Sequence, residues 1–282
     1  MRRVLVAVAL AAAVLVIYAW WAMRPTAPPP GAPLQGFQLR VEPVPSLKLV
    51  VLVDNNPYNG LRSPWGISVH VEAGGRRVLF DTGPDPATLE ENAKRLGVNL
   101  SEIDAVVISH EHGDHVGGLP AVARAKPGAT VYIPKGFSPR TAEWIKGLGL
   151  KVVEVEGPAE IYRGIATTGP FRGPPPEQAL IIRVEGLGLV VVTGCAHPGI
   201  EEILRYAYNL TRVHVYAVVG GFHLIGASAS RLQRVAQTML ELGVDQVYPL
   251  HCTGDRARAY LAERLGERYM DGHVGITIEY GP

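Results

Sequence analysis

The chain contains, from residue 105 to residue 115, the segment AVVISHEHGDH, and this stretch decides the fold. Its first four residues are apolar and β-prone, which is typical of a short buried strand. Three histidines and an aspartate follow within six residues, at His110, His112, Asp114 and His115. Residues two apart point to the same side of extended backbone, so His110 and His112 can bind one metal ion together. Asp114 and His115 can face a second ion. A surface loop whose histidines have no role would not explain this density directly after an apolar strand.

Three further histidines stand just past predicted strands, where ligands from different strands converge. They lie in the motifs TGCAHPG (193–199), GGFHL (220–224) and PLHCTG (249–254), and they are His197, His223 and His251. The remaining histidines outside the cluster, His70, His214 and His273, are expected to be structural or at the surface. Both cysteines, Cys195 and Cys252, lie within these motifs, so we interpret them as neighbours of the site rather than as a disulfide.

The pattern from residue 47 onwards alternates short apolar strands with amphipathic helices. Two hairpins are expected, one over Gly74-Gly75 and one over residues 186–188, and a helix is expected over residues 116–125. Hairpins early in each half, followed by strand–helix alternation, predict two sheets covered by helices.

The histidine cluster, together with Phe80-Asp81-Thr82-Gly83 upstream, resembles the signature of the metallo-β-lactamase superfamily. The resemblance implies an α/β fold, a four-layer αββα sandwich that holds two metal ions. It implies that one ion is held by His110, His112 and His197, and that the other is held by Asp114, His115 and His251. It also implies that Asp81 orients the metal-binding loop without binding metal.

The full set of motifs is similar to one subgroup, the 7,8-dihydropterin-6-methyl-4-(β-D-ribofuranosyl)aminobenzene-5′-phosphate synthase-like proteins. Two departures from the superfamily pattern stand out. Cys195 occupies the place where many members have a bridging aspartate, so it is either a soft metal ligand or a small buried residue. His223 is additional to the usual ligands, and a contact with substrate, a role as an acid or replacement of a ligand are all open.

The N-terminal residues form a separate unit. Residues 4–23 are an uncharged apolar run, and about 20 helical residues span the roughly 30 Å of a bilayer core. We therefore expect a transmembrane anchor over residues 1–24, a Pro-rich linker over 25–46 and a catalytic domain over 47–282. A cleaved signal peptide is the alternative, but the run ends without small residues of a cleavage site. Arg2 and Arg3 precede the run, which favours a single-pass protein of the cell membrane with its catalytic domain outside the cytoplasm.

The expected partner is a small-molecule substrate, and the composition does not call for nucleic acid or an acidic partner. With 19% charged residues and a formal net charge of +1, nothing indicates nucleic acid as a partner. We expect two divalent metal ions, zinc first and iron or manganese as alternatives. The expected activity is hydrolysis of a phosphoester, lactone or amide by a metal-activated hydroxide, with Asp114 and His223 as catalytic residues. The alternatives are a transferase of the synthase type named above and a non-enzymatic domain that binds metal or ligand. The sequence leaves the substrate and the oligomeric state open.

Overall fold

The structure, a computed structural model, describes residues 38–281. The predicted membrane anchor, residues 1–24, lies outside the described residues, as does most of the predicted linker. Within residues 38–281, no helix is both long enough and apolar enough to cross a membrane. Residues 38–46, which the sequence assigns to the linker, pack against the second half of the fold, where Val44 N donates to Arg183 O at 2.9 Å.

Two mixed sheets form the centre of the fold. The seven-stranded sheet has the order β13-β1-β2-β3-β4-β5-β6, and the six-stranded sheet has the order β12-β11-β10-β9-β8-β7. The strands of the first sheet are β1 (Leu47–Val53), β2 (Ser68–Ala73), β3 (Arg76–Phe80), β4 (Ala105–Val107), β5 (Thr130–Pro134), β6 (Lys151–Val155) and β13 (Thr277–Tyr280). Those of the second are β7 (Ala159–Tyr162), β8 (Ile165–Thr167), β9 (Leu180–Val184), β10 (Gly188–Thr193), β11 (Val215–Gly221) and β12 (Gln246–Leu250).

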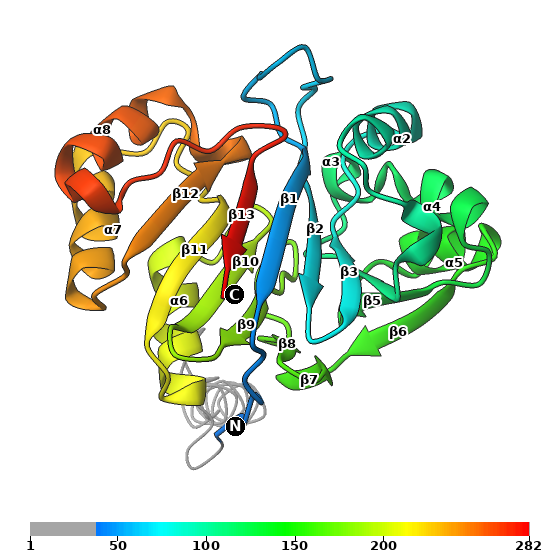
Figure 1. The fold of residues 1–282 in the computed structure, drawn as a ribbon, viewed down its shortest axis with the longest axis horizontal. Helices are drawn as coiled ribbons and strands as arrows, with labels where there is room; N and C mark the ends of the chain where they lie inside the picture. Colours follow the sequence, from blue (N-terminus) through cyan, green and yellow to red (C-terminus); the bar gives the residue numbers. More distant parts are fainter. Residues whose placement is uncertain (1–37, 282) are drawn as a thin grey trace, which may run out of the picture. The chain divides into compact units, whose positions relative to one another are not determined.

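Helices cover the outer face of each sheet. Figure 1 shows α2 to α5 on one side of the sheets and α6 to α8 on the other. These helices are α2 (Pro86–Arg95), α3 (Gly113–Val116), α4 (Leu119–Ala125), α5 (Pro139–Gly147), α6 (Ile200–Thr211), α7 (Ala229–Glu241) and α8 (Asp255–Leu265). Short 3₁₀ turns complete the element order at η1 (Leu100–Glu102), η2 (His251–Thr253) and η3 (Gly266–Arg268).

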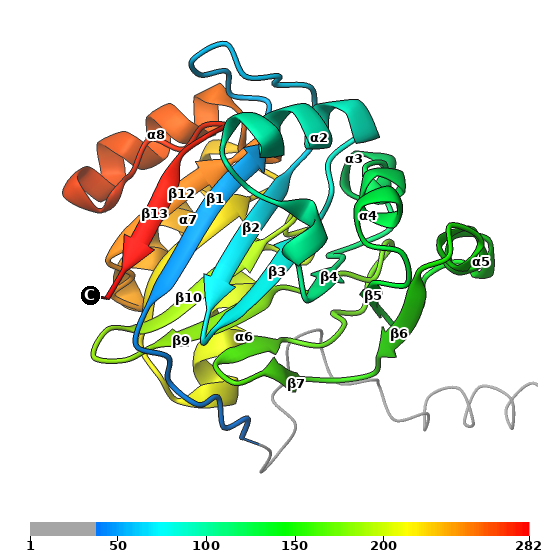
Figure 2. The same ribbon diagram turned by 45° about the vertical axis from the view of Figure 1, so that its right-hand side comes forward.

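The apolar core has three layers that match this arrangement. One cluster of buried residues lies between the two sheets, with Phe80 facing Val190 and Val219. A second joins the first sheet to its helices, and a third joins the second sheet to α6, α7 and α8. The two sheets with their flanking helices confirm the predicted metallo-β-lactamase arrangement (Figure 2).

The polar motifs gather at one edge of both sheets. Strand β4 runs parallel to β3 and β5, and β10, β11 and β12 run parallel to one another. Parallel strands bring their carboxyl ends to the same edge, which is where ligands bind in open α/β sheets. The His110–His115 loop and the segments that follow β10, β11 and β12 all begin there.

Two sequence expectations about elements need correction. The helix expected over 116–125 is broken into α3 and α4 at Gly117-Gly118. Pro120 lies in the first turn of α4 and has no N–H to continue the hydrogen bonds of α3, which explains the break. Glycine is required just before it, because a Cβ on Gly117 would lie 2.0 Å from Pro84 O and one on Gly118 would lie 2.0 Å from Thr82 O. Strands β7 and β8, at the edge of the second sheet, were not expected, because β7 is short and its residues are exposed or only partly buried.

Candidate metal centre

Three histidines from two loops form the first ligand set. The ligand atoms of His110, His112 and His197 all lie within 4.8 Å of one another. His110 Nε2 lies 3.1 Å from His112 Nδ1, close to the roughly 3.3 Å that separates two nitrogen ligands of a tetrahedral zinc ion. Burial and the neighbouring histidines hold the pKa of His110 far below its usual range. His110 is therefore neutral, as a metal ligand must be.

Asp114, His115 and His251 form the second ligand set, within the same 4.8 Å limit. Asp114 Oδ2 lies 3.5 Å from His115 Nε2 and 3.2 Å from His251 Nε2. The Nε2 atom of His251 is buried, and its contact with Asp114 lacks the geometry of a hydrogen bond, so among the described residues it has no hydrogen-bond partner. A buried polar atom without a partner costs free energy, and a metal ion at this position would remove that cost. The residues present therefore fit a pair of divalent cations.

Asp81 lies directly behind the second ligand set. Its carboxylate accepts hydrogen bonds from Ser109 N at 2.7 Å and Ser109 Oγ at 2.6 Å, and it contacts His115 Nδ1 at 2.7 Å. Burial alone would lower the pKa of His115, but the carboxylates of Asp81 and Asp114 raise it to about 10. With Nδ1 held by Asp81, Nε2 of His115 faces Asp114 and Cys195 at the second position, and a carboxylate on the other ring nitrogen is the usual arrangement around a bound metal.

Glu177 has the corresponding place behind the first ligand set, and the sequence did not reveal it. Its buried carboxylate accepts the main-chain N–H groups of Cys195, Ala196 and His197 at 2.7 to 2.9 Å. It also lies 2.8 Å from His197 Nδ1. Burial raises the pKa of Glu177, but these hydrogen bonds outweigh burial and leave the net pKa below the ordinary value. Its position before β9, after three prolines, carries no recognisable pattern.

Asp54 and Asn55 hold the last histidine. His251 N donates to Asp54 Oδ1 at 2.6 Å, and His251 Nδ1 lies 2.8 Å from Asn55 Oδ1. These contacts join residues almost 200 positions apart in the chain. The motif Asp54-Asn55, which directly follows β1, therefore positions His251 from the opposite end of the chain.

Cys195 lies between the two ligand sets. Its Sγ is 3.4 Å from His115 Nε2, and it forms possible metal-binding groups with His110 and His115 and with His197 and His223. It also forms one with His251 and Cys252. Both cysteines are free and buried, as the sequence analysis expected. The hydrogen bond with Cys252, together with burial, raises the pKa of the Cys195 thiol when no metal is bound.

His223, like His112, is an exposed histidine of the cluster. Its ring centroid lies 4.5 Å from that of His197. The hydrogen bond to Cys252 raises the pKa of His223 above its ordinary value. Of the histidines expected to lie outside the site, His70 is buried in β2, His214 is paired with Asp245 at 2.7 Å and His273 stacks on Tyr58.

Backbone strain is concentrated at this centre. Six described non-glycine residues have positive φ, and four of them are Asp81, Ala196, His223 and His251. Such conformations cost free energy and persist where the surrounding structure fixes them, often at functional sites. Gly194 shows how tightly the halves meet, because a Cβ there would lie 2.1 Å from Ser109 Oγ.

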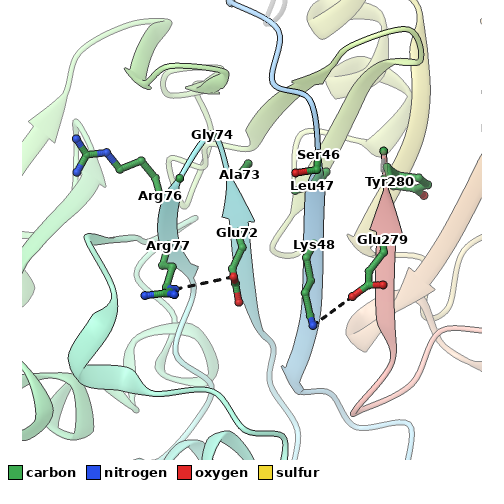
Figure 3. Close-up of a pocket in the computed structure, with 12 residues that line it drawn as sticks. Ser46, Leu47, Lys48, Glu72, Ala73, Gly74, Arg76, Arg77, Glu279 and Tyr280 are labelled. Carbon is green, nitrogen blue, oxygen red and sulfur yellow. Dashed lines mark ion pairs between the residues drawn. The ribbon is translucent and has the colours of Figure 1, made fainter.

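A pocket of about 310 Å³ adjoins the second ligand set, with His251 in its wall. A separate depression of about 450 Å³ lies at the start of β1 and β3 (Figure 3). Four of the charged side chains of that depression pair with one another, Lys48 with Glu279 at 3.2 Å and Arg77 with Glu72 at 3.9 Å. It contains none of the motif residues, so the pocket at His251 is the better candidate for substrate.

The fold, with two candidate ligand sets at the carboxyl ends of its strands, is typical of metal-binding α/β proteins. The sequence matches the metallo-beta-lactamase superfamily over residues 68–251. It is 30% identical to the 7,8-dihydropterin-6-methyl-4-(beta-D-ribofuranosyl)-aminobenzene-5′-phosphate synthase of Methanocaldococcus jannaschii, over 86% of this chain and 99% of that protein. The chain belongs to the metallo-β-lactamase superfamily, as its motifs predict.

Solved structures agree with this membership. A metal-dependent hydrolase of the β-lactamase superfamily superposes with a TM-score of 0.71 at 30% identity, over 84% of this chain and all of that one. A metallo-β-lactamase fold protein from Bacillus subtilis superposes with a TM-score of 0.62 at 12% identity, over 83% of this chain and all of that one, which shows the shared fold alone. The relatives include a synthase and hydrolases, so the expected enzyme family is confirmed.

Proposed function

We propose that this protein is a hydrolase that holds two divalent metal ions and cleaves a phosphoester, a lactone or an amide. The observation that carries the proposal is the meeting of two complete ligand sets beside a pocket of about 310 Å³. Zinc is the proposed metal, because imidazole nitrogens predominate among the ligand atoms and a thiol lies beside them; iron and manganese are the alternatives.

The side chains divide the chemistry between them. When bound, the two ions would lower the pKa of a water molecule towards neutrality and polarise the substrate. The Asp114 side chain is 20% exposed, whereas His115 and His251 beside it are buried. We assign Asp114 to orient the attacking water as well as to bind metal. His223, exposed next to the first ligand set, is assigned to donate a proton to the leaving group.

Cys195 is included as a thiolate ligand. The 3.4 Å between its Sγ and His115 Nε2 is close to the roughly 3.5 Å expected for sulfur and nitrogen on one tetrahedral zinc ion. Cobalt substitution tests this directly, since a thiolate bound to Co²⁺ gives a charge-transfer absorption in the near ultraviolet. We expect Cys195→Ser to lose this band and Cys252→Ser to keep it. A band that disappears only in Cys252→Ser would refute the assignment.

The central experiment measures metal content and turnover in the full-length protein. Phosphodiesters, lactones and amides serve as substrates, and the variants are His110→Ala and Asp114→Ala. His214→Ala is the control, because His214 pairs with Asp245 at the surface. We expect both site variants to lose metal and to lose turnover by at least about 100-fold. Full metal and full turnover in both would overturn the proposal.

A transferase is the second candidate, and the 30% identity to a synthase over nearly the whole domain favours it. In that case, the two metal positions would bind a diphosphate leaving group during a condensation. Release of inorganic diphosphate from pterin precursors, without hydrolysis of the other compounds, would select it. Full metal loading with no turnover of either kind would instead indicate a non-enzymatic binding domain.

Attachment to the cell membrane, with the catalytic domain outside the cytoplasm, belongs to the proposal as well. It rests on the uncharged apolar run over residues 4–23 and on the arginines that precede it. Extraction of the membrane fraction with alkaline carbonate tests the anchor, because a spanning helix stays with the lipid. Protease treatment of intact cells then tests on which side the domain lies.

A further inference from the structure

The wall of the pocket beside the candidate metal centre is partly apolar, although the neighbouring ligand sets are polar and charged. Two large apolar side chains are exposed there, Trp65 at 49% and Ile225 at 60%. Single exposed apolar residues are common on protein surfaces and need no explanation. These two line one concave space with the candidate metal ligand His251, and a concave apolar wall beside a few polar groups is typical of small-molecule sites.

The backbone holds both side chains in place. The Trp65 ring lies 4.6 Å from the His251 ring, at an interplanar angle of 53°. Gly66, the next residue, packs so closely that a Cβ would lie 2.7 Å from Asp114 O, within the second ligand set. On the other side, a Cβ on Gly254 would lie 2.6 Å from Ile225 Cγ1. The apolar wall and the metal positions are therefore fixed relative to each other.

The two asparagine side chains of the wall are already engaged within the protein. Asn55 uses its side chain on His251, donating to its main-chain O at 3.3 Å and meeting Nδ1 at 2.8 Å. Asn56 donates to Asp54 Oδ2 at 2.6 Å. The two charged residues of the lining, Asp255 and Arg256, have opposite signs. The wall thus favours an uncharged flat group over an anion or a cation.

We propose that this pocket binds an uncharged aromatic or heteroaromatic ring of the substrate, stacked on the exposed part of the Trp65 indole and against Ile225, while the bond to be cleaved lies at the metal positions. The inference rests on the proposed function, because it names the class of substrate for that site. Stacking on an aromatic ring and burial of apolar area supply the affinity. A saturated ring of similar size would bury area without the stacking geometry.

Equilibrium binding tests the ring preference without any turnover. The probes are naphthalene-2-carboxamide and its saturated counterpart decahydronaphthalene-2-carboxamide, titrated by calorimetry into the zinc-loaded full-length protein. We expect the naphthyl compound to bind about tenfold more tightly. Trp65→Ala should abolish the preference and Trp65→Phe should retain most of it. Trp144→Ala is the matched control, because Trp144 is 39% exposed on α5, outside the pocket, and should change nothing.

Loss of metal in Trp65→Ala would confuse the result, so zinc content is measured in every variant. Ile225→Ala gives a second reading, since Ile225 has no ring contact with a metal ligand, and it should weaken naphthyl binding about threefold to tenfold. A naphthyl preference that survives in Trp65→Ala, or no preference in the wild type, would overturn the inference. Hydrolysis of small esters without ring preference would refute it while leaving the proposed function intact. Ring binding without any hydrolysis would support the ring pocket and refute the proposed hydrolase function.

Discussion

The two halves of the fold build their parts of the metal centre in different ways. The first half supplies four of the proposed ligands from one loop after β4, and the carboxylate of Asp81 lies behind this loop. The second half supplies one histidine at a time, from the ends of β10 and β12. Glu177 holds three consecutive main-chain N–H groups there, whereas Asp81 holds one, that of Ser109. A compact loop needs a carboxylate that orients a ligand, whereas a scattered set needs one that fixes the loop itself.

The pKa values of Asp81 and Glu177 are shifted in opposite directions, in line with this difference. Burial raises the pKa of Asp81, and its hydrogen bonds and the charge of His115 do not fully offset that effect. For Glu177, the hydrogen bonds from His197 and the main chain outweigh burial, so its pKa lies below the ordinary value. Glu177 therefore stabilises the metal-free fold as a carboxylate, while Asp81 is costly to bury until the centre is complete.

The largest expected effect follows for Glu177→Gln. The amide cannot accept all four donors, so buried N–H groups lose their partner, and we expect a loss of about 3–5 kcal/mol of unfolding free energy. Urea denaturation of the metal-free protein measures it. Glu160→Gln is the control, since exposed Glu160 also accepts two main-chain N–H groups, from Glu42 and Gly164. Equal losses of unfolding free energy in the two variants would show that Glu177 has no special role in fixing the loop of the second half.

Asp81→Asn should act mainly on metal binding. The substitution removes the carboxylate that orients His115, and loss of such a partner typically lowers metal affinity about 10–100-fold. Because the Asp81 carboxylate is costly to bury, the metal-free protein should lose less stability than Glu177→Gln does. Competition with a coloured chelator measures the affinity, and Asp104→Asn in the exposed Arg76 pair is the control. A stability loss in the metal-free protein larger than that of Glu177→Gln would contradict the assignment.

Acid titration sharpens the contrast. The folded-state pKa of Glu177 lies below its ordinary 4.5, so the unfolded chain takes up the proton first as the pH falls. The stability that Glu177 contributes is therefore present above about pH 4.5 and is lost as the pH falls through the folded-state value. The gap in unfolding free energy between wild type and Glu177→Gln should narrow from pH 7 towards pH 3. A constant gap over that range would show that the carboxylate charge is not what stabilises the loop.

The sequence revealed the two halves of the centre to different extents. The ligands of the first half form a local pattern after one strand, and a pattern of this kind is visible without the fold. The later histidines were recognised from the resemblance of their motifs. Glu177 was missed because its partners lie 18 to 20 residues away, across a hairpin, and nothing in the residues around it marks it. The hydrogen bonds from the Asp54-Asn55 motif to His251 are equally invisible before the chain folds, since they join opposite ends of the domain.

The smallest expected effect concerns His70, a buried histidine of the first half that faces no ligand set. Neither ring nitrogen has a hydrogen-bond partner among the described residues. Burial lowers its pKa below the ordinary 6.5. Since the unfolded chain then takes up the proton first, stability should fall as the pH drops below about 6.5. An apolar side chain of similar volume removes the unsatisfied nitrogens, so His70→Leu should gain about 1 kcal/mol and flatten this part of the pH profile.

Thermal or urea unfolding between pH 5 and pH 8 measures both effects of His70→Leu. His214→Leu is the control, because His214 is 43% exposed and pairs with Asp245, so its replacement should bring no gain. A loss of stability in His70→Leu would mean that the imidazole has a partner in solution, such as a bound water molecule. The first half would then satisfy all its buried polar groups. His70 and His115 would then differ only in the source of the partner. Solvent would supply it for His70, whereas carboxylates of the protein surround His115 and raise its pKa.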